Sequence, residues 1–125
     1  MKFICPRCRG VSMKITSSIE LPPDAGSDEI NLQILKCLKC GFDGIGVYEE
    51  TRRGKLDSEL VHHRGYYVDD SVLASLEKMI KQCPKPNKTS CLCKIHHSLG
   101  CTNAFGMWNW LDKITRKDSF KLELV

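Results

Sequence analysis

The chain has 125 residues and a formal charge of +4, with 42% apolar and 27% charged residues. This length fits one domain, and the composition excludes a wholly disordered chain. No apolar run reaches the roughly 18 residues of a membrane-spanning helix, and the first residues lack the apolar core of a secretory signal, so we expect a cytoplasmic protein with no membrane partner.

The first third of the chain predicts antiparallel strands. Apolar and polar residues alternate in the segments 11–21, 30–34 and 42–48. A segment rich in proline, glycine and aspartate, residues 22–28, predicts the loop between the first two strands. Gly44 and Gly46 weaken the third strand and indicate a bulge or the close approach of another backbone.

A polar stretch follows the predicted strands. Residues 51–64 predict a loop with at most one helical turn, and residues 65–68 a short strand. Within 52–67, cations alternate with aromatic side chains, a combination that can follow a phosphate backbone and stack bases. The alternative is a solvated loop with two tyrosines packed inward. An imidazole can do acid–base work near neutrality, but no nucleophile or carboxylate is placed by the sequence beside His62 and His63, which disfavours a catalytic role.

The second half of the chain predicts a helix and, at its end, a strand. Residues 69–71 have short acceptor side chains that can cap the free N–H groups of a helix start. An apolar stripe then runs to Cys83, where Pro84 ends the helix. Alternation over 120–124 predicts the terminal strand.

A second helix is expected after residues 102–103, which can cap it. Its apolar stripe consists of Met107, Trp110, Leu111 and Ile114. Gly106 costs such a helix about 1 kcal/mol. Trp108 and Trp110 are interpreted as core residues rather than as ligand contacts.

Eight cysteines are the unusual feature of the composition, and they fall into two groups of four. In a reducing compartment such groups indicate metal ligands rather than disulfides. Two tetrahedral zinc sites need four ligands each, so we expect two zinc ions. Each Zn(Cys)4 centre carries a charge of −2, which brings the formal charge of the chain to about zero and weakens the case for a nucleic-acid partner.

The first group consists of two Cys-x-x-Cys pairs, formed by Cys5, Cys8, Cys37 and Cys40. In such a pair the turn aims both sulfur atoms inward, and its N–H groups stabilise the thiolates. Gly10 and Gly41 are expected to supply the left-handed residue that closes each turn. Two disulfides or four free thiols are the alternatives, and iron in a rubredoxin-like site would use the same thiolates.

These residues resemble the zinc-ribbon superfamily. The resemblance rests on Cys5-Pro6-Arg7-Cys8 and Cys37-Leu38-Lys39-Cys40-Gly41, and covers residues 3–50. It implies a three-stranded antiparallel sheet in which the four cysteines bind one zinc ion. The 28 residues between Cys8 and Cys37 exceed the more common gap of about 15 to 20, which a longer hairpin accommodates. Membership would indicate the fold and the metal, but not the task.

The second group lies within residues 83–101 and matches no common signature. Our first choice of ligands is Cys83, Cys91, Cys93 and Cys101, and the main alternative replaces Cys101 by His96 or His97. Without a metal these thiols would be buried or paired in a long loop with two prolines, which is uncommon in compact domains. Four lysines, Lys81, Lys85, Lys88 and Lys94, flank the group, and we interpret them as compensating the thiolate charge rather than contacting phosphate.

The sequence therefore predicts an α+β fold in two parts. Residues 1–50 form an N-terminal three-stranded antiparallel zinc ribbon. Residues 51–125 form a metal-stapled part with two helices and a terminal strand, and both parts are expected to share one core, because neither alone buries enough apolar surface.

The expected function is structural zinc binding in a non-enzymatic interaction module, with a protein partner favoured over nucleic acid. One alternative is an RNA- or DNA-binding protein that uses residues 52–67. The other is a zinc metalloenzyme whose second site keeps an open coordination position. A Zn(Cys)4 site is closed and electron-rich, and therefore activates water poorly.

Overall fold

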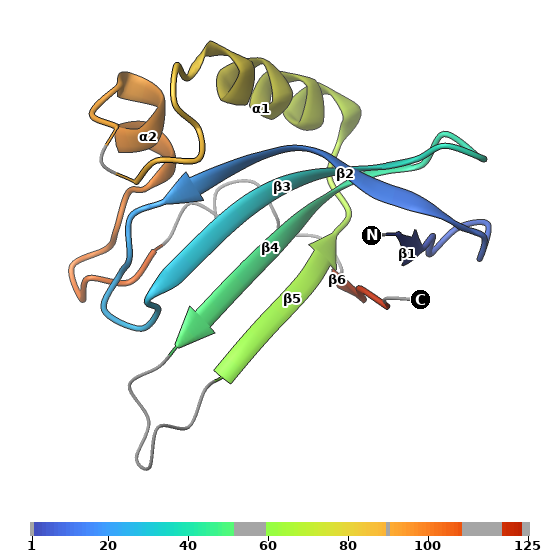
Figure 1. The fold of residues 1–125 in the computed structure, drawn as a ribbon, viewed down its shortest axis with the longest axis horizontal. Coiled ribbons are helices and arrows are strands. Elements are labelled where there is room, and N and C mark those ends of the chain that lie inside the picture. Colours follow the sequence, from blue (N-terminus) through green and yellow to red (C-terminus); the bar gives the residue numbers. More distant parts are fainter. Residues whose placement is uncertain (1, 52–59, 90, 109–118, 124–125) are drawn as a thin grey trace.

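The computed structural model describes residues 2–51, 60–89, 91–108 and 119–123. Within these residues, six antiparallel strands form one sheet in chain order, which curls into a half-barrel (Figure 1). The strands are β1 (Phe3–Ile4), β2 (Val11–Leu21), β3 (Glu29–Cys37), β4 (Asp43–Thr51), β5 (Leu60–Tyr66) and β6 (Ser119–Lys121). The helices are α1 (Asp70–Gln82) and α2 (Lys94–Leu99). No helix in these described ranges is long and apolar enough to cross a membrane.

The predicted architecture, a three-stranded ribbon packed with a two-helix part, is wrong. The three predicted strands are present as β2, β3 and β4, but β5 continues the sheet along β4 and β6 continues it along β5. We expected a loop over most of β5, because its sequence is polar and its apolar period is weak. Glu50 pairs with Val61, and the register continues without a shift to the pair of Ile45 and Tyr66. This regular pairing shows that backbone hydrogen bonds define the strand.

The second predicted helix is also wrong in its described part. Asn103 Oδ1 accepts hydrogen bonds from the N–H groups of Phe105 and Met107, at 2.9 and 3.1 Å. Gly106 adopts a φ of 77°, which closes a tight turn before Trp108. An asparagine that binds nearby backbone groups competes with helix formation, and here the turn is formed. The rest of that prediction, residues 109–114, lies outside the described residues.

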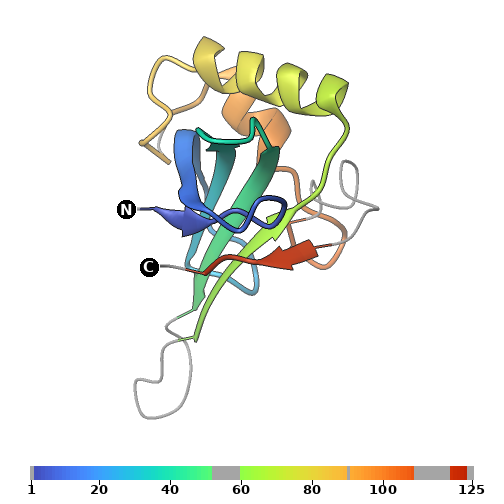
Figure 2. The same cartoon turned by 90° about the vertical axis from the view of Figure 1, so that its right-hand side faces the viewer.

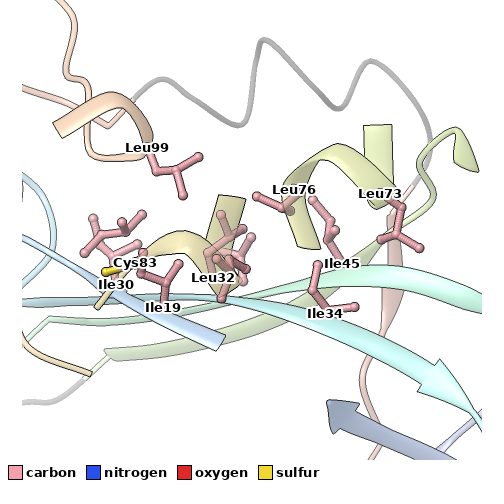
Figure 3. Close-up of a cluster of buried hydrophobic side chains, with 12 residues drawn as sticks. Ile19, Ile30, Leu32, Ile34, Ile45, Leu73, Leu76, Cys83 and Leu99 are labelled. Carbon is pink, nitrogen blue, oxygen red and sulfur yellow. The ribbon is translucent and has the colours of Figure 1, made fainter. Parts of the chain in front are cut away.

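The first predicted helix is confirmed as α1, which ends at Gln82, just before Cys83 and Pro84. It packs with α2 on one side of the sheet (Figure 2). Side chains from both helices meet those of β2, β3 and β4 in one buried cluster (Figure 3). The cluster includes Ile19, Leu21, Ile30, Leu32, Ile34, Ile45, Val47, Leu73, Leu76, Ile80, Cys83 and Leu99. Residue 50, the predicted boundary, lies inside β4; the division into two parts stays a prediction.

A second, smaller cluster lies at the end of the sheet that carries the first cysteine group. It contains Phe3, Cys5, Met13, Leu35, Cys37, Phe42 and Phe120. Phe120 of β6 covers Gly65 of β5, and a Cβ at Gly65 would collide with its ring. The predicted close approach of another backbone is confirmed at Gly44, where a Cβ would lie 3.1 Å from the Tyr66 carbonyl oxygen, whereas a Cβ on Gly46 would meet the Gln33 side chain. Shifts of strand register lie instead between Ile15 and Ser17 of β2 and between Phe3 and Ile4 of β1.

Candidate metal centres

The first candidate metal centre is built on two turns of the sheet. Cys5 and Cys8 lie in the turn between β1 and β2, while Cys37 ends β3 and Cys40 lies in the turn that leads to β4. Met13 of β2 pairs with residues of both β1 and β3, so the two turns meet at the same end of the sheet (Figure 1). The four Sγ atoms lie within 4.8 Å of one another.

The sulfur spacing fits a tetrahedral metal ion. Cys5 Sγ lies 3.6 Å from Cys40 Sγ, and Cys8 Sγ lies 3.8 Å from Cys37 Sγ. Four sulfur atoms bound to zinc at about 2.3 Å would lie about 3.8 Å apart. A disulfide would need a separation of about 2.05 Å, and all eight cysteines are free. The first group is therefore arranged as a set of metal ligands.

The backbone of both turns is directed at the sulfur atoms. Cys37 Sγ accepts hydrogen bonds from the N–H groups of Lys39 and Cys40, both at 3.4 Å. Gly41 has the predicted left-handed backbone, with a φ of 78°. In the other turn Arg9, with a φ of 62°, takes this conformation instead of Gly10, which corrects our prediction. Gly10 instead donates its backbone N–H to Cys8 Sγ at 3.4 Å.

The surroundings of Cys37 favour its thiolate. Burial by itself raises the pKa of this thiol, but the Ser12 hydroxyl, 3.1 Å from Cys37 Sγ, and the two backbone N–H groups lower the pKa to about 6. Burial raises the pKa of Cys5 to about 11, so an ion that binds there must displace a proton. Arg7 supplies a nearby cation, and its Nη2 donates to the Cys40 carbonyl at 2.7 Å.

The second candidate metal centre lies outside the sheet. Cys83 follows α1, Cys91 and Cys93 lie in the next loop, and His96 lies in the first turn of α2. Cys83 Sγ lies 3.9 Å from Cys91 Sγ and 3.5 Å from Cys93 Sγ. His96 Nδ1 lies 3.1 Å from Cys83 Sγ and 3.5 Å from Cys93 Sγ, close to the separation of about 3.6 Å in a tetrahedral zinc site. The four ligand atoms lie within 4.8 Å of one another.

The orientation of the His96 ring is fixed by β2. Its Nε2 lies 2.9 Å from the Glu20 carbonyl oxygen, which can only accept a hydrogen bond. Nε2 therefore carries the proton, and the lone pair of Nδ1 faces the sulfur atoms, as in metal-binding histidines that donate their other N–H to a carbonyl. His96 is 2% exposed, so it is held in this position by packing as well.

The thiols of the second group also differ in their ease of ionisation. The His96 backbone N–H, 3.4 Å from Cys93 Sγ, and then the imidazole lower the pKa of Cys93 to about 6. Burial raises the pKa of Cys83 to about 11. Each candidate centre thus combines a readily ionised thiol with a buried one whose proton a metal ion must displace.

No family model, curated protein or solved structure matches the chain. The zinc-ribbon resemblance therefore rests on the two cysteine turns. The ligand types and spacing of the two groups are compatible with metal binding.

The structure separates the ligand candidates that the sequence left open. It brings Cys83, Cys91 and Cys93 together with His96, whereas Cys101 Sγ points to the His97 carbonyl oxygen at 3.5 Å and lies outside the group. His97 is exposed. The signal for His96 is its spacing from Cys93, which equals that of the Cys-x-x-Cys pairs and lets one turn direct both ligands inward. The ligand set of this site itself stays a prediction.

The predicted nucleic-acid segment is described only from residue 60 onward. His63 of β5 is half-buried; its Nε2 lies 2.7 Å from Gln33 Oε1, and its ring packs edge-on against Phe3 and Tyr48. Tyr66 packs against the larger core cluster, and Tyr67 lies against Phe42 and Phe120. The described aromatic side chains of this segment therefore take part in internal packing.

The sequence predicts that the two tryptophans are core residues. Trp108 packs against the larger core cluster, and its Nε1 donates to the Leu99 carbonyl at 2.6 Å. Its backbone N–H donates to Asp24 Oδ2 at 2.7 Å, which fixes the turn before it to the loop after β2. The interpretation is confirmed for Trp108, and Trp110 lies outside the described residues.

Proposed function

We propose that the protein binds two structural zinc ions, one by four thiolates and one by three thiolates and an imidazole. The supporting observation is that two separate sets of four ligand atoms have the spacing of tetrahedral zinc ligands. Thiolate and imidazole donors suit zinc, and the mixed set of the second site also argues against a rubredoxin-like iron centre. We propose that the zinc-ribbon likeness is limited to the two turns of the first site.

A structural role is supported by the number of ligands. Each group already supplies four protein ligands, which leaves no position for a water molecule or a substrate. The neighbouring groups, the Ser12 hydroxyl and the Glu20 carbonyl, stabilise or orient the ligands. These features favour a non-enzymatic protein over a metalloenzyme with an open second site.

Each ion would connect parts of the chain that are distant in the sequence. The first would link the turn between β1 and β2 to the turn between β3 and β4. The second would hold α1, α2 and the loop between them against the end of β2, where the Glu20 N–H also donates to the Pro86 carbonyl at 2.7 Å. Zinc binding would therefore contribute directly to the free energy of folding.

We further propose that the protein is a cytoplasmic interaction module with a protein partner. The first centre would contribute a charge of −2 and the second −1, which lowers the formal charge from +4 to +1. This small charge argues against a nucleic-acid partner held mainly by phosphate contacts.

Native mass spectrometry tests the proposal with a matched pair of variants in adjacent positions. The wild-type protein should carry two zinc ions, His96→Gln should carry one, and His97→Gln should keep two. Cys101→Ser should also keep two. Retention of both ions by His96→Gln, or loss of one by Cys101→Ser, would assign the second site to other ligands, and a wild-type protein without zinc would refute the proposed function.

A further inference from the structure

We propose that the surface around Leu92, at the second metal centre, binds an acidic segment of a partner protein that also carries an apolar side chain. This inference rests on the proposed function, because the second ion would hold the loop that carries Leu92. The surface lies at the end of β2 and α2, across the sheet from both termini (Figure 1).

Leu92 is the most exposed of the large apolar residues that the structure describes. It lies between Cys91 and Cys93, and 96% of its surface is accessible. Both neighbours belong to the ligand group, so the loop holds the leucine outward while the sulfur atoms point inward. An apolar side chain fixed in this way gains free energy only when a partner covers it.

Leu92 forms a ridge between two hollows. One has a volume of about 340 Å³ and is also lined by Pro22, Thr89 and His97. The other has a volume of about 440 Å³ and is also lined by Pro84, Lys85 and Lys88. Both exceed the roughly 300 Å³ at which ligand pockets begin, so either can accept a side chain of a partner.

Lysines surround this apolar ridge. Lys85, Lys88 and Lys94 are exposed and line the two hollows. In the described part of the chain none of the three forms an ion pair. A centre with three thiolates and a neutral imidazole carries only −1, so three cations exceed what compensation of its charge requires.

Three cations near the first centre show the contrast. Arg7 binds the Cys40 carbonyl and stacks over Phe42, with its Cζ 5.7 Å from the ring centroid. Arg9 pairs with Glu123 at 3.4 Å, and Lys36 pairs with Glu77 at 3.0 Å. These cations interact with other groups of the same chain, whereas the lysines around Leu92 are available to carboxylates of a partner.

The apolar character of the surface selects the partner class. A nucleic acid would use the lysines but not Leu92, and the described residues that line the two hollows include no Phe, Tyr or Trp on which a base could stack. An acidic protein segment with an apolar side chain would use both, because its carboxylates can pair with the lysines while its side chain covers Leu92.

Selection from short random peptides displayed on phage, with the zinc-loaded full chain as target, tests the proposal. The selected peptides should combine several acidic residues with at least one large apolar residue. Selection of basic peptides, or of no shared pattern, would overturn the proposal. Tighter binding of a uridine oligonucleotide than of the selected peptides would also overturn it, in favour of nucleic acid.

Titration of a selected, fluorescently labelled peptide against variants then locates the surface. Leu92→Ser should weaken binding about tenfold or more, as truncation of a central apolar contact does. Leu38→Ser is the control and should leave binding unchanged, because Leu38 also directly follows a ligand cysteine and is 62% exposed, but belongs to the first centre. Substitution of Lys85, Lys88 and Lys94 by Gln should weaken binding and reduce its dependence on salt.

The zinc content of each protein distinguishes a failure of the proposed docking surface from a failure of the proposed zinc binding. Leu92→Ser should keep two zinc ions, because its side chain points away from the ligand atoms. A wild-type protein with two ions that binds no selected peptide, or a Leu92→Ser variant that binds as well as the wild type, refutes the docking surface alone. A wild-type protein that lacks the second ion refutes the proposed function on which the surface depends.

Discussion

The two candidate metal centres solve the same chemical problem with different supports. In the first, the ligands come from turns that join paired strands, so the sheet itself positions the sulfur atoms. In the second, the ligands come from a helix end, a loop and a short helix, and two hydrogen bonds of Glu20 connect this assembly to β2. A site within the sheet is expected to stabilise the whole fold, and a site beside it mainly its own segment.

Removal of a ligand from the first centre should have the largest effect. We expect Cys37→Ser to release one ion and to unfold most of the sheet, because a structural zinc ion contributes on the order of 10 kcal/mol, comparable to the stability of a whole domain. Circular dichroism and thermal unfolding measure this loss. Cys101→Ser is the control and should melt like the wild type; a Cys37→Ser variant with two ions and an unchanged melting temperature would contradict the ligand assignment.

Removal of a ligand from the second centre should be milder and local. His96→Gln is expected to cost roughly 2–5 kcal/mol, the range found when a disulfide link is lost from a small domain. Hydrogen exchange should show faster exchange in α2 and in residues 83–93, with protection of β2, β3 and β4 retained. His97→Gln should leave exchange unchanged. Equal loss of protection across the sheet would show that the two centres do not differ in the way the structure indicates.

The hydrogen bond from Ser12 offers a finer test of the first centre. Ser12→Ala removes the hydroxyl that lies 3.1 Å from Cys37 Sγ, and such neighbouring groups typically change metal affinity by about 10- to 100-fold. Competition with a chelator should therefore show that one zinc ion per chain is bound more weakly than in the wild type, while the other is bound with unchanged affinity. Weakening of the His96 site instead would place Ser12 outside the first centre.

The sequence could predict the first centre because its information is local. Each Cys-x-x-Cys pair lies in one turn, and β2, β3 and β4 have clear alternation. The second centre depends on α2, whose six residues are too few for an apolar period to be seen. The sequence-based prediction therefore ranks Cys101 above His96 as the fourth ligand, whereas the structure places His96 beside the three thiols and holds its ring against the Glu20 carbonyl oxygen, 76 positions earlier.

The errors in the fold have a similar cause. β5 carries polar residues, and its place is determined by its pairing with β4, while the two described helices lie on one side of the sheet. The segment after Cys101 has an apolar stripe of helical period, yet Asn103 and Gly106 form a turn. In both places long-range pairing or local side-chain hydrogen bonds outweigh the periodicity on which the prediction relied.

A pH effect at His63 should be the smallest of the expected changes. Burial lowers the pKa of His63 below its usual value of about 6.5, so on acidification the unfolded chain takes up a proton before the folded one does. Stability should therefore fall as the pH drops from about 6.5, with no contribution from His63 above that pH. Phe3, Gln33 and Tyr48 contact the ring, and Tyr48 in turn donates to Glu50 at 2.8 Å.

Comparison of melting temperatures between about pH 7 and 5.5 checks this effect. His63→Gln should reduce the loss of stability on acidification, and His62→Gln, on the exposed side of β5, should not. Both proteins must retain two zinc ions over this range, which mass spectrometry verifies. An unchanged pH dependence in His63→Gln would show that His63 titrates normally in the folded protein.

Zinc-edge X-ray absorption of the wild-type protein tests the central claim most directly. We expect the two ions together to be bound by seven sulfur atoms and one nitrogen atom. The Zn–S distances should be about 2.3 Å and the single Zn–N distance about 2.0–2.1 Å. Elemental analysis of the same sample should give two zinc ions per chain. A single zinc ion, eight sulfur ligands without nitrogen, or a water oxygen bound to either ion would contradict two closed structural centres.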